Sequence, residues 1–272
     1  MIITFEESME KCNSGMKPSE LWKPMIKSYE DCYLNFKGDK TIQRIPKILH
    51  QIWLGSPFPD KYKKLTDLWQ ELHPDWTVLI WDEKKIDEFG LANRWMYDNM
   101  RNPSAKSDVV RYEVAYSYGG VYVDTDFLPC KSFNDLLYLD MFCGLVGSYD
   151  GKLVNPEENL APSIFGCSQG NGFVEQILIK IGQQKTVPRS IGEIMTITGP
   201  VMFSREVTHN IQDHGMTVIF PPTYFYPFPG QQRETIRNLS FEDMRTAMKH
   251  YTCPETYAMH LWYCSWQQAH LL

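Results

Sequence analysis

The chain has 272 residues and a formal net charge of −6, and 43% of its residues are hydrophobic and 22% charged. This is the composition of a globular protein that can bury a full core in one large domain. The acidic balance and the absence of a basic block argue against a nucleic-acid-binding protein, so we expect no nucleic-acid partner.

The seven cysteines include no Cys-x-x-Cys pair, which argues against a disulfide framework and against a zinc knuckle. Reduced thiols in a reducing compartment are the simplest interpretation, and we expect a cytoplasmic location. The first residues lack the basic and apolar regions of a signal peptide. No apolar run reaches the roughly 18 residues that cross a bilayer, so no transmembrane anchor is expected.

Residues 1–44 are polar and mixed, and they predict a helical N-terminal extension with pieces at Phe5–Lys11 and Ser19–Tyr33. We expect this extension to pack on the main domain, and docking of an acceptor or a membrane is the alternative role. Residues 45–272 are expected to form a single domain.

The next stretch predicts the beginning of a parallel sheet. Ile45–Gly55 reads as a buried strand, interrupted near its carboxyl end by His50 and Gln51. Asp60–Leu72 has apolar residues at helical spacing, and Trp76–Trp81 follows as a second strand. A β-α-β start of this kind predicts an α/β fold with a mostly parallel central sheet, whose ligands bind at the carboxyl ends of the strands.

A helix is predicted over residues 103–118, with an asparagine as its cap and a proline in its first turn. A helical wheel places Asp108 and Arg111 on the face toward the protein, and Val110 and Glu113 on the opposite side. Asp108 and Arg111 form an i,i+3 pair. Such a pair is either a structural ion pair or, turned inward, a grip for hydroxyl groups or phosphate oxygens, and we favour the second role.

The strongest signal is the stretch Gly119–Asp126, which reads Gly-Gly-Val-Tyr-Val-Asp-Thr-Asp. If it is one strand, alternation places Tyr122, Asp124 and Asp126 on the same face, with the two carboxylates about 6–7 Å apart. Unpaired buried carboxylates are costly, and a divalent cation is the usual remedy. Oxygen ligands of this kind suit Mn²⁺ or Mg²⁺, and these ions suit a diphosphate.

Two other interpretations of the aspartates are weaker. Solvated acids at a strand end fit poorly behind an apolar run. A phosphatase of the haloacid dehalogenase type uses the first Asp of Asp-x-Asp as a nucleophile, but there the pair normally lies on the first strand and is followed by Gly-Thr or Val-Thr. Here Phe127 and Leu128 follow, and the pair lies in mid-chain.

The rest of the chain alternates apolar runs with turn signals. We expect strands at Met141–Val146, Ala161–Cys167 and Met216–Phe220, helices at Gly172–Gln183, 200–213 and Met244–Lys249, a polar loop at 147–160, and a final strand from Thr256 that breaks into an aromatic tail.

Two single residues have alternative roles. Trp53, at a strand's carboxyl end, is either core or a flat face for a nucleobase. His260 is either structural or a neutral ligand that completes an Mn²⁺ shell.

Four motifs occur in one order and spacing: Ile-Pro-Lys-Ile-Leu-His-Gln-Ile-Trp from Ile45, the Trp76–Trp81 strand, Asp108-Val-Val-Arg111, and Gly-Gly-Val-Tyr-Val-Asp-Thr-Asp. Together they resemble the glycosyltransferases with an Asp-x-Asp sugar-binding region. This family includes fungal α1,6-mannosyltransferases and α1,4-galactosyltransferase relatives and, more remotely, the glucosylating domains of large clostridial toxins. The similarity resumes at Thr198-Gly199-Pro200 and around His260.

This resemblance implies a nucleotide-sugar-binding fold of the GT-A type and a retaining transfer that depends on Mn²⁺ or Mg²⁺. The donor-binding residues it implies are Gln51, Ile52, Trp53, Asp108, Arg111, Tyr122, Asp124, Ser265 and Trp266. The implied metal ligands are Asp124, Asp126 and His260, and the implied catalytic residues are Asp108, Arg111, Asp124 and Asp126. Ser265 and Trp266 match a tail that closes over the diphosphate.

The expected reaction moves a hexose from a nucleotide sugar to a hydroxyl of a glycan, glycolipid or protein acceptor. UDP-hexose, such as UDP-glucose or UDP-galactose, is the favoured donor, and GDP-mannose is the alternative. A module that binds sugar nucleotides without catalysis is the competing class of function, although each expected ligand position holds a competent residue.

Overall fold

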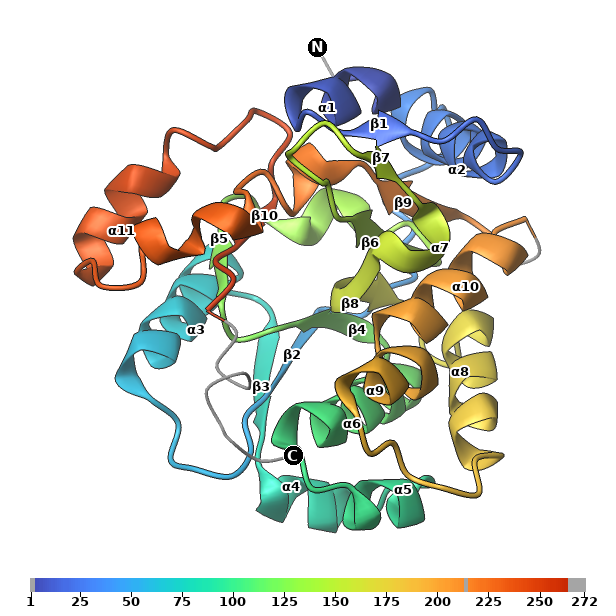
Figure 1. The fold of residues 1–272 in the computed structure, drawn as a ribbon, viewed down its shortest axis with the longest axis vertical. Coiled ribbons are helices and arrows are strands. Elements are labelled where there is room, and N and C mark those ends of the chain that lie inside the picture. Colours follow the sequence, from blue (N-terminus) through green and yellow to red (C-terminus); the bar gives the residue numbers. More distant parts are fainter. Residues whose placement is uncertain (1–2, 213–214, 264–272) are drawn as a thin grey trace.

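A twisted sheet of six strands forms the centre of the protein (Figure 1). The computed structural model describes residues 3–212 and 215–263. The strands run in the order β3-β2-β4-β8-β6-β9. Their bounds are β2 Ile48–Ile52, β3 Thr77–Trp81, β4 Gly120–Val123, β6 Met141–Leu145, β8 Leu160–Cys167 and β9 Thr217–Phe220.

The strand directions confirm an α/β fold with a mostly parallel sheet, as expected for the GT-A type. The pairs β2–β3, β2–β4 and β6–β9 are parallel. Only β8 runs against its two neighbours, β4 and β6. The sequence did not indicate this reversal, because an antiparallel strand buried on both faces has the same apolar pattern as a parallel one.

Two small sheets flank the central one. β1 (Gly15–Met16) pairs in parallel with β7 (Leu153–Val154). β5 (Phe127–Pro129) pairs antiparallel with β10 (Ala258–His260), and His260 lies opposite Phe127. The second pair places β10, which comes late in the chain, beside β5, which follows β4 after a short turn.

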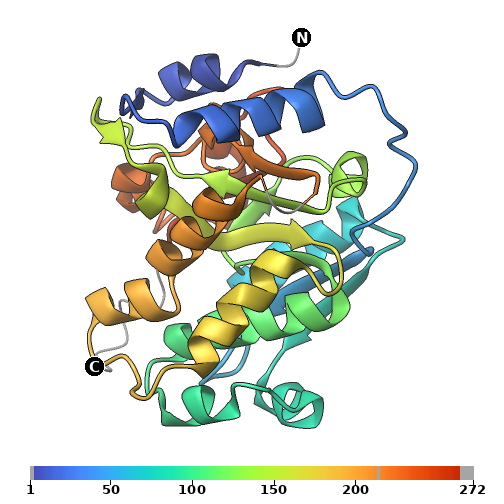
Figure 2. The same cartoon turned by 90° about the vertical axis from the view of Figure 1, so that its right-hand side faces the viewer.

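Helices cover the sheet on both sides (Figures 1 and 2). They are α1 Phe5–Lys11, α2 Trp22–Tyr29, α3 Asp60–Leu72, α4 Glu83–Phe89, α5 Arg94–Asn99, α6 Pro103–Tyr118, α7 Pro156–Asn159, α8 Gly172–Gly182, α9 Ile191–Ile197, α10 Pro200–Asn210 and α11 Phe241–Met248. A π-helical turn at Glu30–Leu34 and 3-10 turns at Phe133–Leu136, Pro222–Tyr224 and Gly230–Thr235 complete the helical segments. Within the described ranges, no helix combines the length and the apolar character that a membrane crossing requires.

The N-terminal helices pack at the β9 end of the sheet, at the top of Figure 1 in blue. Tyr29 of α2 is completely buried, and its hydroxyl bonds to Tyr224 at 2.7 Å and donates to the carbonyl of Ile3 at 2.6 Å. Ser8 of α1 bonds to Thr223 at 2.8 Å. The first helices therefore share one aromatic core with the segment that follows β9.

The predicted faces of α6 are wrong in one respect, because this helix is buried nearly all round. Val110 and Glu113, which the wheel placed on the outer side, are 0% and 4% exposed. The helix lies between the sheet and α8, so no side of its middle turns faces solvent. The Glu113 carboxylate accepts hydrogen bonds from the backbone N–H groups of Ala92 and Asn93, at 3.2 and 2.7 Å, which offset the cost of burying it.

Other differences from the sequence prediction are local. The stretch 147–160 contains β7 and the short helix α7 rather than only a loop, and the final strand is limited to Ala258–His260. Helix α9 was not predicted, since it follows a polar stretch and none of its residues is buried. It shows that an exposed helix with little apolar periodicity gives a weak signal in the sequence.

His50 connects three elements around β2. Its Nε2 donates to the carbonyl of Gly119 at 2.9 Å, and its Nδ1 accepts from Nε1 of Trp81 at 3.0 Å. These partners select the neutral ring, because protonated Nδ1 cannot accept a hydrogen bond. Burial lowers the pKa of His50 to about 4, and its bond to the Gly119 carbonyl only partly opposes that shift.

This environment predicts an acid-sensitive fold. The unfolded chain takes up a proton at His50 near its ordinary pKa of about 6.5, whereas the folded chain does so near 4. The stabilisation is therefore complete above about pH 6.5 and is lost as the pH falls toward 4. We expect His50 to remove about 2 kcal/mol from the free energy of unfolding between pH 7 and pH 5.

Urea unfolding of the wild type and of His50→Asn at the two pH values measures this contribution. The variant should be less stable at pH 7 and should lose less stability on acidification. His209→Asn is the control, because that histidine is half exposed on the surface beside Glu157. An equal pH dependence in the wild type and in His50→Asn would contradict the assignment.

Candidate active site

The Asp-x-Asp pair lies in a turn, not in a continuous strand. β4 ends at Val123, and β5 begins at Phe127. The N–H of Phe127 donates to the carbonyl of Asp124 at 3.3 Å, which closes the turn between them. The prediction that strand alternation extends through Asp126 is therefore wrong. The turn, not the period of a strand, holds the two carboxylates near each other.

Gly120 allows β4 to lie close to its neighbour. Its φ is +100°, a region that side chains rarely adopt, and a Cβ here would lie 2.5 Å from the carbonyl oxygen of Ile48. The Gly119-Gly120 pair thus ends α6 and leads directly into β4 at the centre of the sheet, as the sequence predicted.

A bulge in β8 supports the turn from the other side. Cys143 pairs with Phe165, but the next residue, Gly144, pairs with Ala161. The residues of β8 between these pairs bulge from the ladder. Their carbonyls turn toward the site: that of Ser163 accepts from the N–H of Asp124 at 2.7 Å, and that of Pro162 accepts from Nη1 of Arg111 at 2.9 Å. Bulges often re-aim groups beside functional sites, and no pattern in the sequence indicated this one.

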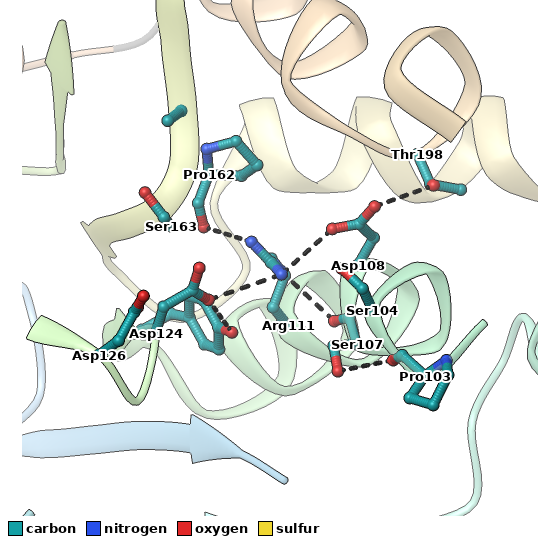
Figure 3. A network of polar contacts seen from close by, with 12 residues as sticks. Pro103, Ser104, Ser107, Asp108, Arg111, Asp124, Asp126, Pro162, Ser163 and Thr198 are labelled. Atoms are coloured by element: carbon teal, nitrogen blue, oxygen red, sulfur yellow. Dashed lines mark hydrogen bonds and ion pairs between the residues drawn. The ribbon is translucent and has the colours of Figure 1, made fainter. Parts of the chain in front are cut away.

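Arg111 is the centre of the polar network in Figure 3. Its Nη2 lies 3.1 Å from Oδ1 of Asp108 and 3.6 Å from Oδ1 of Asp124. The guanidinium stacks over the Tyr122 ring, with its central carbon 4.7 Å from the ring centroid. The Tyr122 hydroxyl donates to Asp124 at 2.5 Å. The structure thus brings together four residues that the sequence singled out.

One guanidinium contacts two carboxylates here, of which Asp108 is buried and Asp124 is partly buried. Burial raises the pKa of Asp108 to about 7; Arg111 opposes this shift, and the negative charge of Asp124 adds to it. Burial likewise raises the pKa of Asp124, against the effect of Arg111. The hydroxyl of Thr198, directly after α9, donates to Oδ2 of Asp108 at 3.2 Å. In the sequence, Thr198 stood out only as part of Thr198-Gly199-Pro200, where the resemblance to the glycosyltransferases resumes.

Asp124, Asp126 and His260 form the one group of possible metal ligands in the described part of the chain. Each offers a ligand atom, and these atoms lie within 4.8 Å of one another. Nε2 of His260 is 3.1 Å from Oδ1 of Asp126. Burial by itself would raise the pKa of Asp126, but His260 and the N–H of Tyr263 more than offset it, so this pKa is lowered.

The donor set fits a divalent ion such as Mn²⁺ or Mg²⁺. Two carboxylates and one imidazole are suitable ligands for Mn²⁺, and oxygen-rich sites also hold Mg²⁺. The His260 ring turns Nε2 toward the carboxylates, while its Nδ1 is buried without a partner among the described residues. No described residue therefore holds the His260 ring through a hydrogen bond at Nδ1.

The predicted residues on and after β2 lie in different environments. Gln51 is completely buried, and its Oε1 accepts from the hydroxyl of Thr66 on α3 at 2.7 Å, so its side chain is engaged within the fold. Ile52 is buried beside Trp81. Trp53 is partly buried, and its ring packs on Tyr62 at a centroid distance of 4.8 Å. Ser265 and Trp266 lie outside the described residues.

A row of aromatic rings joins Trp53 to the possible metal ligands. The Tyr62 ring contacts that of Tyr263 at 6.2 Å, and the N–H of Tyr263 donates to Oδ2 of Asp126 at 3.0 Å. Lys61 places its ammonium over both tyrosine rings. Burial lowers the pKa of Lys61, and the charge of Asp126 opposes that shift. Nothing in the sequence distinguished Lys61 from the other lysines of α3.

Comparison with known proteins shows a family that part of this site resembles. Residues 59–142 match the family described as glycosyltransferase sugar-binding region containing DXD motif. This stretch of the chain resembles that family, and the match covers less than a third of the 272 residues. The matched segment contains Asp108, Arg111 and both residues of the Asp-x-Asp pair, whereas Trp53 and His260 lie outside it.

Individual relatives agree with the family match. Over 194 residues the chain is 26% identical to inositol phosphoceramide mannosyltransferase 3 of Schizosaccharomyces pombe, an alignment that covers 67% of this chain and 50% of that protein. It is 24% identical over 232 residues to an uncharacterized glycosyltransferase of Acanthamoeba polyphaga mimivirus, covering 82% and 84% of the two chains. The chain thus spans about half the length of the fungal relative.

Among solved structures, the ligand-free glycosyltransferase domain from the YGT toxin resembles this chain with a TM-score of 0.47 and 11% identity, covering 77% of this chain and 89% of that one. The galactosyltransferase LgtC, solved with donor and acceptor sugar analogues, gives a TM-score of 0.40 at 10% identity, covering 80% and 87%.

The ligand set predicts direct binding of Mn²⁺. We expect His260→Ala and Asp126→Asn each to raise the dissociation constant for Mn²⁺ at least about tenfold, because each removes one of three protein ligands. The loss of the electron paramagnetic resonance signal of free Mn²⁺ on titration with protein measures this binding. Asp135→Asn is the matched control, since Asp135 is half exposed and paired with Lys131. Unchanged binding in both site variants would place the ion elsewhere.

Proposed function

We propose that this chain is a metal-dependent hexosyltransferase that takes a nucleotide sugar as donor and a hydroxyl group as acceptor. The observation that carries the proposal is that Asp124 takes part in two arrangements of side chains. This residue belongs both to the possible metal ligands and, through Arg111, to the buried pair with Asp108. A nucleotide sugar needs both arrangements side by side, one for its diphosphate and one for its sugar.

Asp124, Asp126 and His260 would hold the ion, which supplies positive charge for the diphosphate leaving group. Binding and orientation of the sugar would then depend on the protein's own side chains. Asp108 and Arg111 are rigid because each has a second partner, Thr198 and the Pro162 carbonyl respectively. We assign them the orientation of the sugar hydroxyls. Positioning and electrostatic stabilisation, rather than a covalent intermediate, would then provide most of the rate.

We extend the proposal to retention of the anomeric configuration. Asp108 and Asp124 are both engaged by Arg111, and Asp124 also accepts from the Tyr122 hydroxyl. Neither carboxylate is therefore arranged as a free nucleophile. In the proposed reaction, the acceptor hydroxyl attacks from the side of the leaving group and gives its proton to a diphosphate oxygen. The anomeric configuration of the product, measured by NMR, tests this step.

Two donors remain in the proposal. UDP-hexose is the donor favoured by the resemblance of the sequence motifs. GDP-mannose is favoured by the names of the fungal relatives, which are mannosyltransferases. The same names make a phosphoinositol-containing sphingolipid the first acceptor to test, beside glycans and proteins. A thermal-shift screen of UDP-glucose, UDP-galactose and GDP-mannose with Mn²⁺ identifies the donor, since a bound ligand stabilises the folded state.

Asp126→Asn tests the catalytic role. The amide cannot replace a carboxylate as a metal ligand of equal charge, so we expect loss of both sugar transfer and metal-dependent hydrolysis of the donor, by at least about a hundredfold. Release of UDP or GDP measures both reactions. The control is Asp135→Asn, which should keep full activity.

Two results would contradict the proposal in different ways. Activity of the wild-type level in Asp126→Asn would remove the metal-dependent mechanism. Tight binding of a nucleotide sugar by the wild type, with no turnover toward water or any acceptor tested, would instead favour a binding module without catalysis.

A further inference from the structure

We infer that Lys61 is a diphosphate-binding residue of this site, whose ammonium contacts the phosphate oxygens of the donor beside the metal carboxylates. The inference rests on the proposed function and deepens it. It assigns a role to a side chain that neither the sequence motifs nor the family match distinguished.

The first observation is the position of the ammonium. Lys61 lies in the first turn of α3, and its Nζ is 4.6 Å from the ring centroid of Tyr62 and 4.5 Å from that of Tyr263. Contacts of this kind hold a lysine in place without neutralising its charge. The ammonium is therefore fixed and still available to an anion.

The second observation is what the two tyrosines contact. Tyr263 is hydrogen-bonded to one of the possible metal ligands, because its N–H donates to Oδ2 of Asp126 at 3.0 Å. Tyr62 packs against Trp53, the residue expected beside the nucleobase. Lys61 thus lies between the proposed base position and the proposed metal position. In a nucleotide sugar, the diphosphate occupies the corresponding place between the base and the sugar.

The third observation is charge. The two carboxylates among the possible metal ligands, Asp124 and Asp126, balance the charge of one divalent ion, and Arg111 is already engaged by Asp108 and Asp124. A nucleoside diphosphate brings further negative charge, which needs another cation. Among the described residues, Lys61 forms no ion pair with a carboxylate. Arg237, whose charge also acts on Lys61, is paired with Glu234 at 3.1 Å.

A packing role is the alternative explanation, in which Lys61 only fastens α3 to Tyr263. The two roles differ in what a neutral side chain of similar length would change. Lys61→Gln keeps the first half of the aliphatic stem and a polar end but removes the charge, whereas Lys61→Arg keeps the charge and its contact with aromatic rings. Lys64→Gln is the matched control, because Lys64 lies on the same helix with its ammonium 5.5 Å from the ring centroid of Phe241.

The experiment is isothermal titration of the full chain with UDP, GDP, UMP and GMP in the presence of Mn²⁺. For the nucleotide that the wild type prefers, we expect Lys61→Gln to weaken binding of the diphosphate about tenfold and of the monophosphate much less. Binding by Lys61→Gln should also depend less on the NaCl concentration. Lys61→Arg and Lys64→Gln should bind nearly as the wild type does.

Several outcomes would overturn the inference. Wild-type affinity for the diphosphate in Lys61→Gln would do so, as would an equal loss in Lys64→Gln. An equal loss for monophosphate and diphosphate, with unchanged salt dependence, would assign Lys61 to packing. If the wild type binds neither UDP nor GDP with Mn²⁺, the proposed function itself fails and this inference fails with it. If the wild type binds one of them and Lys61→Gln binds it equally well, only the inference is overturned.

Discussion

The site depends on one buried cation, the guanidinium of Arg111. It balances Asp108 and Asp124, stacks on Tyr122 and donates to the carbonyl of Pro162. Removing one partner of a buried ionic group typically costs several kcal/mol, because the other charge is left without compensation. The middle of α6, the turn after β4 and the bulge of β8 are therefore linked by the contacts of a single side chain. A lysine could not replace it, since it lacks the planar fork that reaches several acceptors at once.

The surrounding structure makes this arrangement possible at modest cost. α6 is buried on nearly every side, so Arg111 and Asp108 lie in buried surroundings in which their attraction is stronger than in water. The bulge of β8 provides two carbonyls at the same point, one for Arg111 and one for the N–H of Asp124. Both the charged groups and the backbone of the turn are thereby satisfied by neighbours, which is the condition for keeping polar groups inside a core.

The sequence predicted those features that local patterns determine. The period of apolar residues and the capping signals gave α3, α6 and β3 within a residue or two, and the inward pair Asp108/Arg111 followed from helical spacing. It missed features that depend on contacts between distant segments. Examples are the direction of β8, the bulge at Ser163, the turn that replaces the strand at Asp124, and Lys61, whose environment is formed by Tyr263. A strand's direction or a lysine's neighbours leave no periodic trace in the chain.

The pairing of β5 with β10 also has a consequence for how the protein is made. Asp126 and the N–H of Tyr263 meet although they are 137 positions apart, and closing a loop of that length costs about 4 kcal/mol of chain entropy. On a ribosome, Asp124 and Asp126 emerge long before His260, so the complete set of ligands forms only after most of the sheet can have folded. An ion held by these three residues would therefore bind to a nearly complete scaffold, and a nascent or shortened chain that ends before β10 would have the Asp-x-Asp pair without the third possible ligand.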